Sequence, residues 1–292
     1  MALDGVLLFG AAGQLGHELA SRLHVLGPVT ALTRQDIDLS NAAALRSLLQ
    51  AQRPAVIVNA AAYTAVDKAE QEPALAQAIN VTAPSVMAEE AASSGAVLVH
   101  YSTDYVFNGQ ATRPYLETDP TDPQSVYGRT KRDGEQAVIQ SGARYVLLRS
   151  SWVVGAHGQN FLKTMLRLAQ ERDSLRVVAD QVGVPTSSAW MAETTVLALQ
   201  QGLNGLFHLT PAGQTNWHAY AQYVLQQAQS LGWTLKATPE QVQAITTADY
   251  PLPAPRPAYS MLESSLLAKA LNLELPPWQA GVDSVLRVLR AD

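Results

Sequence analysis

A tyrosine and a lysine four residues apart, Tyr127 and Lys131, are the pair in this sequence best suited to proton transfer. On a helix, positions four apart lie on one face, so the phenol and the ammonium would be neighbours. The cation favours the phenolate and would lower the pKa of the tyrosine toward the range in which a general acid works best. Thr103, which lies upstream, can share a hydrogen bond to the same substrate oxygen. Together the three residues offer what a ketone needs when it receives a hydride and then a proton, although Tyr and Lys also fall four apart by chance in many helices.

A glycine-rich turn near the start of the chain indicates a dinucleotide site. Val6–Phe9 is a short apolar run typical of a buried strand, and Gly10, Gly13 and Gly16 follow it before a helical pattern. Such a turn lets the backbone approach a pyrophosphate, which then sits at the positive N-terminus of the helix. The spacing is one residue wider at the first gap than in G-x-G-x-x-G. A loop that needs glycines only to turn is the alternative, but strand, turn and helix together favour cofactor binding.

Apolar runs alternate with helical stretches over the first half of the chain. Strands are expected at Val6–Phe9, Pro28–Leu32, Val56–Val58, Val97–Val99 and Val146–Leu148, and helices at Leu15–Leu26, Ala42–Gln50, Pro73–Ser93 and Gln124–Gln140. Strands without a polar face that alternate with helices indicate a parallel sheet covered on both faces. The fold class is therefore α/β, a Rossmann-type doubly wound sheet. Asn41 is the expected cap of the second helix, and Asp122-Pro123 the expected start of the helix that carries Tyr127.

The pattern loosens after about residue 152. Four prolines between Pro251 and Pro257 predict an extended segment, and helices return at Trp190–Gln200, Trp217–Leu231 and Pro277–Leu289. We expect an NAD(P)-binding Rossmann domain over residues 1–152 and a smaller α/β, mainly substrate-binding lobe over residues 153–292. Segments such as Leu175–Val178 and Leu206–Leu209 are expected to return to the first domain's sheet.

The composition restricts the class of protein. The 292 residues are 47% hydrophobic and 15% charged, which suits a globular chain. A net charge of -5 gives no basic surface for nucleic acid or anionic lipid, and the lack of cysteine excludes disulfides and thiolate metal sites. No apolar run is long enough to span a membrane, and no signal peptide is evident at the N-terminus. We expect a cytoplasmic protein, although a chain without cysteine also fits other compartments.

Several motifs together resemble those of the extended short-chain dehydrogenase/reductases and, within them, the dTDP-4-dehydrorhamnose reductase family. The resemblance covers nearly the whole chain and rests on the order and spacing of Phe9–Gly16, Asn59–Glu70, Ser102–Phe107, Tyr127–Lys131, Asn160–Phe161, Asp180–Thr186 and Arg256–Leu262. It implies that the C4 ketone of dTDP-4-dehydro-6-deoxy-L-mannose (dTDP-4-dehydro-L-rhamnose) is reduced with NADPH to dTDP-L-rhamnose, the last step of dTDP-rhamnose synthesis.

The family's catalytic residues match Thr103, Tyr127 and Lys131. The resemblance implies that Tyr127 gives a proton to the C4 oxygen of the sugar and that Lys131 lowers the Tyr127 pKa and binds the nicotinamide ribose. Thr103 would orient the carbonyl and steady the developing alkoxide. Related sugar-nucleotide dehydratases carry Asp-Glu where this chain has Asp104 and Tyr105. A phenol cannot replace that glutamate as a base at neutral pH, so ketone reduction is favoured over dehydration.

The resemblance also implies a set of cofactor contacts. They are Gly10, Gly13, Gln14, Leu15, Gly16, Asp38, Leu39, Ala60, Ala61, Ala62, Tyr63 and Thr64, with Tyr127 and Lys131. The cofactor choice depends on the end of the second strand, where a carboxylate selects NAD and an arginine accommodates a 2′-phosphate. Arg34 stands there with no carboxylate before Asp36. The sequence therefore favours NADPH, with NADH also accepted, unless Arg34 is only a solvated surface residue.

The substrate side is implied by the same resemblance. Its residues are Thr103, Asp104, Tyr105, Tyr127, Trp152, Asn160 and Arg256. A tryptophan in the position of Trp152 packs against the sugar, whose deoxyhexose ring offers an apolar face. A tryptophan at a domain interface is the alternative. Arg256 can pair with the diphosphate, because a guanidinium binds phosphate with two parallel hydrogen bonds.

A magnesium site is not expected. Glu18 and Glu193 fall where some family members are thought to bind magnesium, but Arg287 and Arg290 stand where a further acid would be needed. Hard cations require several oxygen ligands. A homodimer remains open.

Two other functions are compatible with the motifs. A regulatory subunit of methionine adenosyltransferase resembles this family and binds the cofactor without an established reductive role. A reductase of another dTDP-4-keto-deoxysugar would keep the chemistry and change the product. The intact Thr103, Tyr127 and Lys131 favour catalysis.

Overall fold

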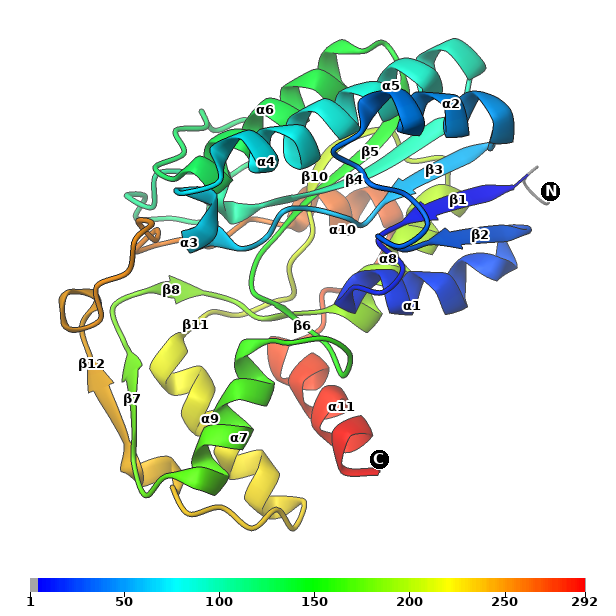
Figure 1. Ribbon diagram of the computed structural model, residues 1–292. Coiled ribbons are helices and arrows are strands. Elements are labelled where there is room, and N and C mark those ends of the chain that lie inside the picture. Colours follow the sequence, from blue (N-terminus) through cyan, green and yellow to red (C-terminus); the bar gives the residue numbers. More distant parts are fainter. Residues whose placement is uncertain (1–4, 292) are drawn as a thin grey trace.

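A parallel sheet of six strands forms the centre of the larger of two lobes (Figure 1). The computed structural model describes residues 5–291, so the first four residues of the N-terminal stretch assessed for a signal peptide lie outside it. The strand order is β10 (Gly205–His208), β5 (Arg144–Ser150), β4 (Val97–Thr103), β3 (Val56–Asn59), β1 (Val6–Phe9) and β2 (Val29–Leu32). The predicted α/β fold is confirmed, and Leu206–Leu209 does return to this sheet through β10.

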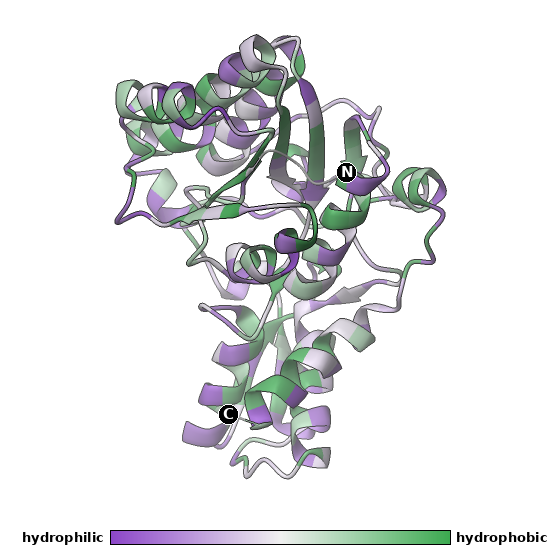
Figure 2. Cartoon of the chain, turned by 90° about the vertical axis from the view of Figure 1, so that its right-hand side faces the viewer, coloured by the Kyte–Doolittle hydropathy of each residue, from purple (hydrophilic) through white to green (hydrophobic). Residues whose placement is uncertain are grey.

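Helices bury both faces of the sheet, as a parallel sheet requires. The face of Val6 and Leu8 packs against α1 (Gln14–Arg22), α8 (Ser188–Gln200) and α10 (Ser265–Leu271). The face of Leu7 and Phe9 packs against α2 (Ala42–Gln52), α5 (Ala83–Ser94) and α6 (Val126–Gln140). Successive residues of a strand point to opposite faces, which explains why every residue of β1 is buried. In Figure 2 the strands at the centre of this lobe are accordingly coloured as hydrophobic.

The smaller lobe is built from three helices and short strand pairs. The helices are α7 (Phe161–Glu171), α9 (Trp217–Ser230) and α11 (Trp278–Ala291), and the pairs are β7 (Leu175–Val178) with β12 (Val242–Ile245), β8 (Val182–Gly183) with β11 (Thr215–Asn216), and β6 (Val153–Val154) with β9 (Thr186–Ser187). The expectation that Leu175–Val178 joins the main sheet is wrong. Only alternate residues of β7 are buried, which fits a small sheet covered on one face rather than the sheet centre.

One of two predicted helix starts differs from the sequence-based expectation. Asn41 caps α2 as predicted, with its side chain accepting from the Ala44 amide at 3.1 Å. The helix that carries Tyr127 begins at Val126, however, and Ser125 caps it by accepting from the Gly128 amide at 3.1 Å. Asp122 is instead held by the Asn108 side chain at 3.2 Å, so the predicted cap was wrong. Tyr127 therefore lies in the first turn of α6.

The helix expected at Pro73–Ser93 is interrupted. It divides into α4 (Pro73–Gln77), a π-helical segment at Ala78–Thr82, and α5. Within that segment, the buried Asn80 side chain accepts from the Tyr63 amide at 2.8 Å and donates to the Tyr63 carbonyl and the Thr130 hydroxyl, each at 3.1 Å. Such π-turns are frequent at functional sites. Here the turn ties the segment after β3 to helix α6.

The proline-rich segment forms no regular helix or strand, and the residues at its end link the lobes. The Tyr259 amide donates to the Gly109 carbonyl at 3.1 Å, and the Tyr115 amide donates to the Met261 carbonyl at 2.8 Å, both on the side of the larger lobe. On its other side, the Ser260 amide donates to the Val182 carbonyl at 2.8 Å. We call residues 254–263 the strap. The strap passes between the loop after β4 and the smaller lobe's strand β8.

Candidate active site

The carboxyl ends of four strands meet along one edge of the sheet. Because the strands are parallel, Gly10, Ala60, Asp104 and Ser151, which follow β1, β3, β4 and β5, come out on the same edge. Ligands of open α/β sheets bind at this edge. The glycine turn, the alanine run and the candidate catalytic residues are therefore brought to one side of the molecule.

Close backbone packing explains two glycines of the first turn. Gly10 has φ +81°, and a Cβ there would lie 2.7 Å from the Ala61 amide nitrogen. A Cβ on Gly16 would lie 1.9 Å from the Gly10 carbonyl oxygen. Gly13 precedes α1 as its N-cap and has more room. The turn thus leaves a side-chain-free cradle at the positive N-terminus of α1, which fits the pyrophosphate of a dinucleotide.

Gln14 and Leu15 begin helix α1 with side chains that are already engaged. The Gln14 amide oxygen accepts from Asn160 at 2.8 Å, and the Leu15 side chain is buried in the core. Asn160 also donates to the Gly155 carbonyl at 2.7 Å and caps α7. Leu15 can therefore meet a cofactor only through its backbone. Asn160, expected on the substrate side, ties the smaller lobe to the glycine turn.

Arg34 is an exposed cation that follows β2. The Asp36 carboxylate accepts from the Thr33 amide at 2.8 Å and the Thr33 hydroxyl at 2.7 Å, and these bonds lower the Asp36 pKa. Asp38 is likewise held by Ser40, which lowers its pKa, and Leu39 packs against the core beside α2. Both carboxylates are thus committed to local turns. The guanidinium is left to meet a ligand at the end of β2.

The segment after β3 is shaped by its own hydrogen bonds. The Asn59 side chain accepts from the Ala61 amide at 3.2 Å, and Ala60 and Ala61 partly bury their methyl groups in the core. Ala62 is half-buried and Thr64 is exposed. Tyr63 is fixed through its backbone by Asn80, and its phenol donates to Glu72. Small side chains therefore line the sheet edge beside the glycine turn.

Thr103, Tyr127 and Lys131 come from two adjacent elements. Thr103 is the last residue of β4, and the other two lie in the first turns of α6. The helix approaches closely because residue 128 is glycine: a Cβ there would lie 2.3 Å from the Tyr105 carbonyl oxygen. The rings of Tyr105 and Tyr127 meet edge to face with centroids 5.5 Å apart. The Thr103 hydroxyl donates to Asp104 at 2.9 Å.

The predicted lowering of the Tyr127 pKa by Lys131 is wrong in this structure. Burial of the phenol and the charge of Asp104 raise the Tyr127 pKa to about 12, partly offset by Thr103. The Lys131 ammonium instead donates to the Tyr101 carbonyl at 2.7 Å and lies 3.4 Å from His100 Nε2. Its burial lowers the Lys131 pKa to about 8, against the effect of Glu135. The four-residue spacing puts the two groups on one helix face but does not direct the ammonium to the phenol.

The substrate-side residues make contacts within the protein. Trp152 has φ +45°, which is unusual for a bulky residue, and stacks on Trp217 with ring centroids 3.6 Å apart. Arg256 forms two hydrogen bonds of 2.6 Å with the Asp67 carboxylate. The strained backbone conformation of Trp152 is of a kind that persists where the surrounding structure holds it, often at ligand sites. The guanidinium that was expected to meet a diphosphate thus already has an anionic partner.

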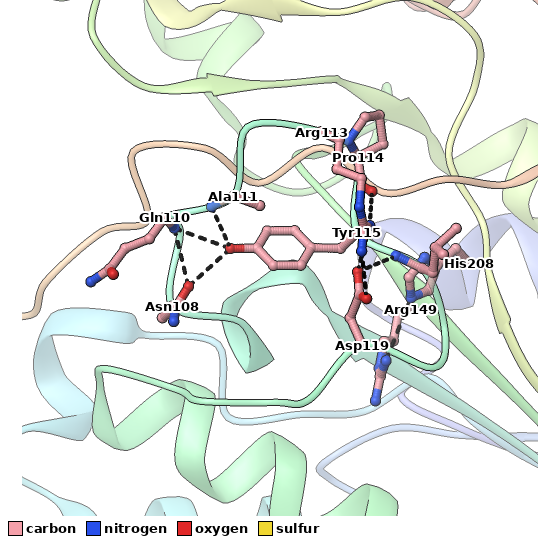
Figure 3. Close-up of polar contacts among 10 residues, drawn as sticks. Asn108, Gln110, Ala111, Arg113, Pro114, Tyr115, Asp119, Arg149 and His208 are labelled. Atoms are coloured by element: carbon pink, nitrogen blue, oxygen red, sulfur yellow. Dashed lines mark hydrogen bonds and ion pairs between the residues drawn. The ribbon is translucent and has the colours of Figure 1, made fainter.

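The loop between β4 and α6 is organised around Tyr115 (Figure 3). Its phenol accepts from the Gln110 and Ala111 amides at 3.1 and 3.2 Å and donates to Asn108 at 3.0 Å. Arg113 closes the far end of the loop by pairing with Asp119 at 2.8 Å. The ordered loop supports the strap, which in turn reaches the candidate site.

An arginine lies between the two glutamates considered for magnesium. Arg22 donates to Glu18 and also to Glu193 at 3.3 Å. Between residues 5 and 291, no group of three or more His, Asp or Glu side chains is arranged to hold a metal ion. The same range contains no helix long and apolar enough to cross a membrane.

Four residues near the site were missed by sequence reasoning: Asn80, His100, Asp67 in its pairing with Arg256, and Ser260. Asn80 and His100 are polar residues within apolar patterns, which was a usable signal. Asp67 and Arg256 lie 189 positions apart, and local patterns cannot reveal such a pairing.

Comparisons with known proteins agree with this geometry. The family model described as the RmlD substrate binding domain matches residues 4–291. The dTDP-4-dehydrorhamnose reductase of Salmonella typhimurium is 44% identical over 290 residues, with 96% of each chain covered. That of Burkholderia thailandensis is 42% identical over 293 residues, with 97% of this chain and 98% of the relative covered.

Solved structures show the same relation over the whole fold. A dTDP-4-dehydrorhamnose reductase from Clostridium acetobutylicum superposes with a TM-score of 0.91 at 35% identity, covering 98% of this chain and 99% of the other. The enzyme from Bacillus anthracis, solved in complex with NADP, gives 0.91 at 33% identity, covering 99% and 100%. The resemblance found in the motifs is confirmed, and the chain belongs to the dTDP-4-dehydrorhamnose reductase family of NAD(P)H-dependent oxidoreductases.

Proposed function

We propose that the protein reduces the C4 ketone of dTDP-4-dehydro-6-deoxy-L-mannose with NADPH, giving dTDP-L-rhamnose in the last step of its synthesis. The observation that carries this proposal is the placement of Thr103, Tyr127 and Lys131 at the carboxyl edge of the sheet, beside the glycine turn. Relatives that bear the name of this reaction cover nearly the whole chain. The same residues favour a reductase over a non-catalytic regulatory subunit.

The glycine cradle supports a dinucleotide cofactor. Gly10, Gly13 and Gly16 would meet its pyrophosphate, and Ala60 and Ala61 leave the neighbouring edge free of large side chains. NADPH supplies the hydride that reduces the ketone carbon. The exposed Arg34 would bind the 2′-phosphate, which supports a preference for NADPH, with NADH accepted less well.

Tyr127 is proposed to give its phenolic proton to the C4 oxygen. With a pKa of about 12, the phenol holds this proton at neutral pH and can deliver it when negative charge develops on the oxygen. Lys131, one turn further along α6, would offset the charge left on the phenolate. Thr103 would help to orient the carbonyl. Tyr105 leaves no carboxylate base for the elimination of water.

The sugar nucleotide is proposed to bind between this edge and the strap. Trp152, held by its stack on Trp217, would present an indole face to the deoxyhexose, and Arg256 would exchange Asp67 for the diphosphate. Tyr105 lies close to both Arg256 and Tyr127, and its ring meets that of Tyr127 edge to face. Residues 1–152 are thus proposed to hold the cofactor and residues 153–292 mainly the sugar, in a cytoplasmic enzyme that can form a homodimer.

The test follows the loss of nicotinamide absorbance with purified protein, NADPH and dTDP-4-dehydro-6-deoxy-L-mannose. We expect turnover with dTDP-L-rhamnose as product, and a fall of about a hundredfold or more in Tyr127→Phe, with unchanged NADPH affinity. Wild-type turnover in Tyr127→Phe would rule out the proton-donor role. NADPH binding without turnover would favour the regulatory function, and turnover only with another keto-deoxysugar nucleotide would identify the alternative reductase.

A further inference from the structure

Asp104 is a buried carboxyl group with an unsatisfied oxygen beside the proposed proton donor. The residue is 2% exposed, and its Oδ1 accepts from the Thr103 hydroxyl at 2.9 Å. Its Oδ2 has no hydrogen-bond partner within residues 5–291. A buried oxygen without a hydrogen bond costs much free energy when the carboxyl group is ionised. The cost is smaller when the group is a neutral carboxylic acid. Burial raises the Asp104 pKa to about 6, against the effects of Ser260 and Thr103.

The neighbours of Asp104 provide hydroxyl groups rather than positive charge. Ser260 faces it from the strap, and its hydroxyl is 3.4 Å from the Val182 carbonyl, to which it can donate. Because a serine oxygen also accepts, a protonated Asp104 can donate to Ser260 while Ser260 keeps its bond to Val182. Arg256 is held by Asp67, and Lys131 is turned to the Tyr101 carbonyl. Among the described residues, no cation is one of the main causes that set the Asp104 pKa.

The titratable groups that face Asp104 are two phenols, Tyr105 in the same turn and Tyr127 on α6. The negative charge of Asp104 raises the pKa of both, so an ionised Asp104 opposes the formation of phenolate. Proton donation breaks the O–H bond of Tyr127, forms one on the C4 oxygen and leaves a phenolate that later regains a proton from solvent. Asp104 itself gains and loses nothing in this step. An ionised Asp104 nevertheless makes this step less favourable, because its negative charge destabilises the phenolate that the step leaves.

We propose that Asp104 is a positioning residue that acts as a neutral carboxylic acid during the reduction, holding the Thr103 hydroxyl while keeping negative charge away from the Tyr127 phenolate. This inference rests on the proposed role of Tyr127. Its consequence is a pH dependence with a defined sign. The protonated form is the effective one, so turnover falls as the pH rises through the Asp104 pKa.

The experiment compares kcat and kcat/KM between pH 5.5 and 7.5 in the wild type and in Asp104→Asn, with blanks for the acid decay of NADPH. Asparagine keeps the shape and the oxygen that Thr103 binds, and it is neutral at every pH. We expect wild-type kcat to fall by up to about tenfold per pH unit over this range, as titration of one group requires, and the Asp104→Asn profile to be nearly flat. Lys131, with a pKa of about 8, titrates mainly above this range and should affect both profiles alike.

Ser260→Ala provides a second test if Asp104→Asn does not fold. Because the Ser260 hydroxyl lowers the Asp104 pKa, its loss should move the limb to higher pH without an equal change in KM. A wild-type profile that is flat across this range, or an Asp104→Asn profile that keeps the wild-type limb, would overturn the inference. Absence of any wild-type turnover with the keto sugar would instead refute the proposed function.

Discussion

Burial lowers the pKa of Lys131, one of the three proposed catalytic residues. Its ammonium is enclosed by the sheet edge and α6, bonded to the Tyr101 carbonyl, and Glu135, one turn further on, is committed to Arg149 through bonds of 2.7 and 2.9 Å. No carboxylate of the described chain forms an ion pair with Lys131. The protein therefore bears the cost of an incompletely compensated buried cation, which a purely structural position would not require.

Lys131→Met should consequently stabilise the protein and remove activity. The folded pKa of about 8 lies below the unfolded value of 10.5, so between these pH values the unfolded chain binds more protons, and the wild-type free energy of unfolding gains about 3 kcal/mol as the pH rises. Urea unfolding at pH 7 and pH 10 should show the variant more stable than the wild type at pH 7, with a smaller difference at pH 10. A less stable variant at pH 7 would mean that the ammonium is well compensated.

At the level of elements, the π-helical segment between α4 and α5 connects the segment after β3 to helix α6, which carries the proposed catalytic residues. The Asn80 side chain joins the Tyr63 backbone to Thr130 on α6, and a Cβ at Gly134 would lie 2.1 Å from the Asn80 carbonyl oxygen. The extra residue of the π-turn thus places an amide where a regular helix would continue its apolar face. One side chain then fixes the segment after β3 and the position of α6.

Asn80→Ala should weaken both stability and cofactor binding. Loss of three hydrogen bonds, one to Thr130 and two to Tyr63, should cost about 2–4 kcal/mol and loosen the segment beside the glycine turn. Asn216→Ala is the matched control, because it removes a helix cap worth about 1 kcal/mol at the start of α9 in the smaller lobe, away from the glycine turn and α6. Urea unfolding and NADPH titration by fluorescence should show both variants destabilised but only Asn80→Ala with reduced affinity. Equal NADPH affinity in the two would limit Asn80 to a structural role.

At the scale of the whole molecule, the sequence predicts the features that depend on residues close together in the chain, such as single strands and turns. Apolar runs and glycine spacing located the strands of the sheet and its carboxyl edge, because the central strands β1 and β3 are buried on both faces. The pairing of β7 with β12, the bond between Arg256 and Asp67, and the direction of the Lys131 ammonium were not predictable, since each depends on segments that only the fold brings together. Ser125 replaced Asp122 as the cap because Asn108 engages the aspartate.

The strap offers a test of whether the two lobes must be held together for substrate binding. Gly109 has φ +77°, and a Cβ there would lie 2.5 Å from the Cα of Pro257, so Gly109→Ala must displace the strap from the loop after β4. Gly142 has φ +78° with nothing within 4 Å of such a Cβ, so Gly142→Ala carries the same backbone strain, about 1 kcal/mol, without that displacement. Because Arg256 and Ser260 lie on the strap, Gly109→Ala should raise KM for the sugar nucleotide several-fold, while NADPH affinity stays as in Gly142→Ala. Equal KM values in the two variants would show that the strap's position against this loop does not set substrate binding.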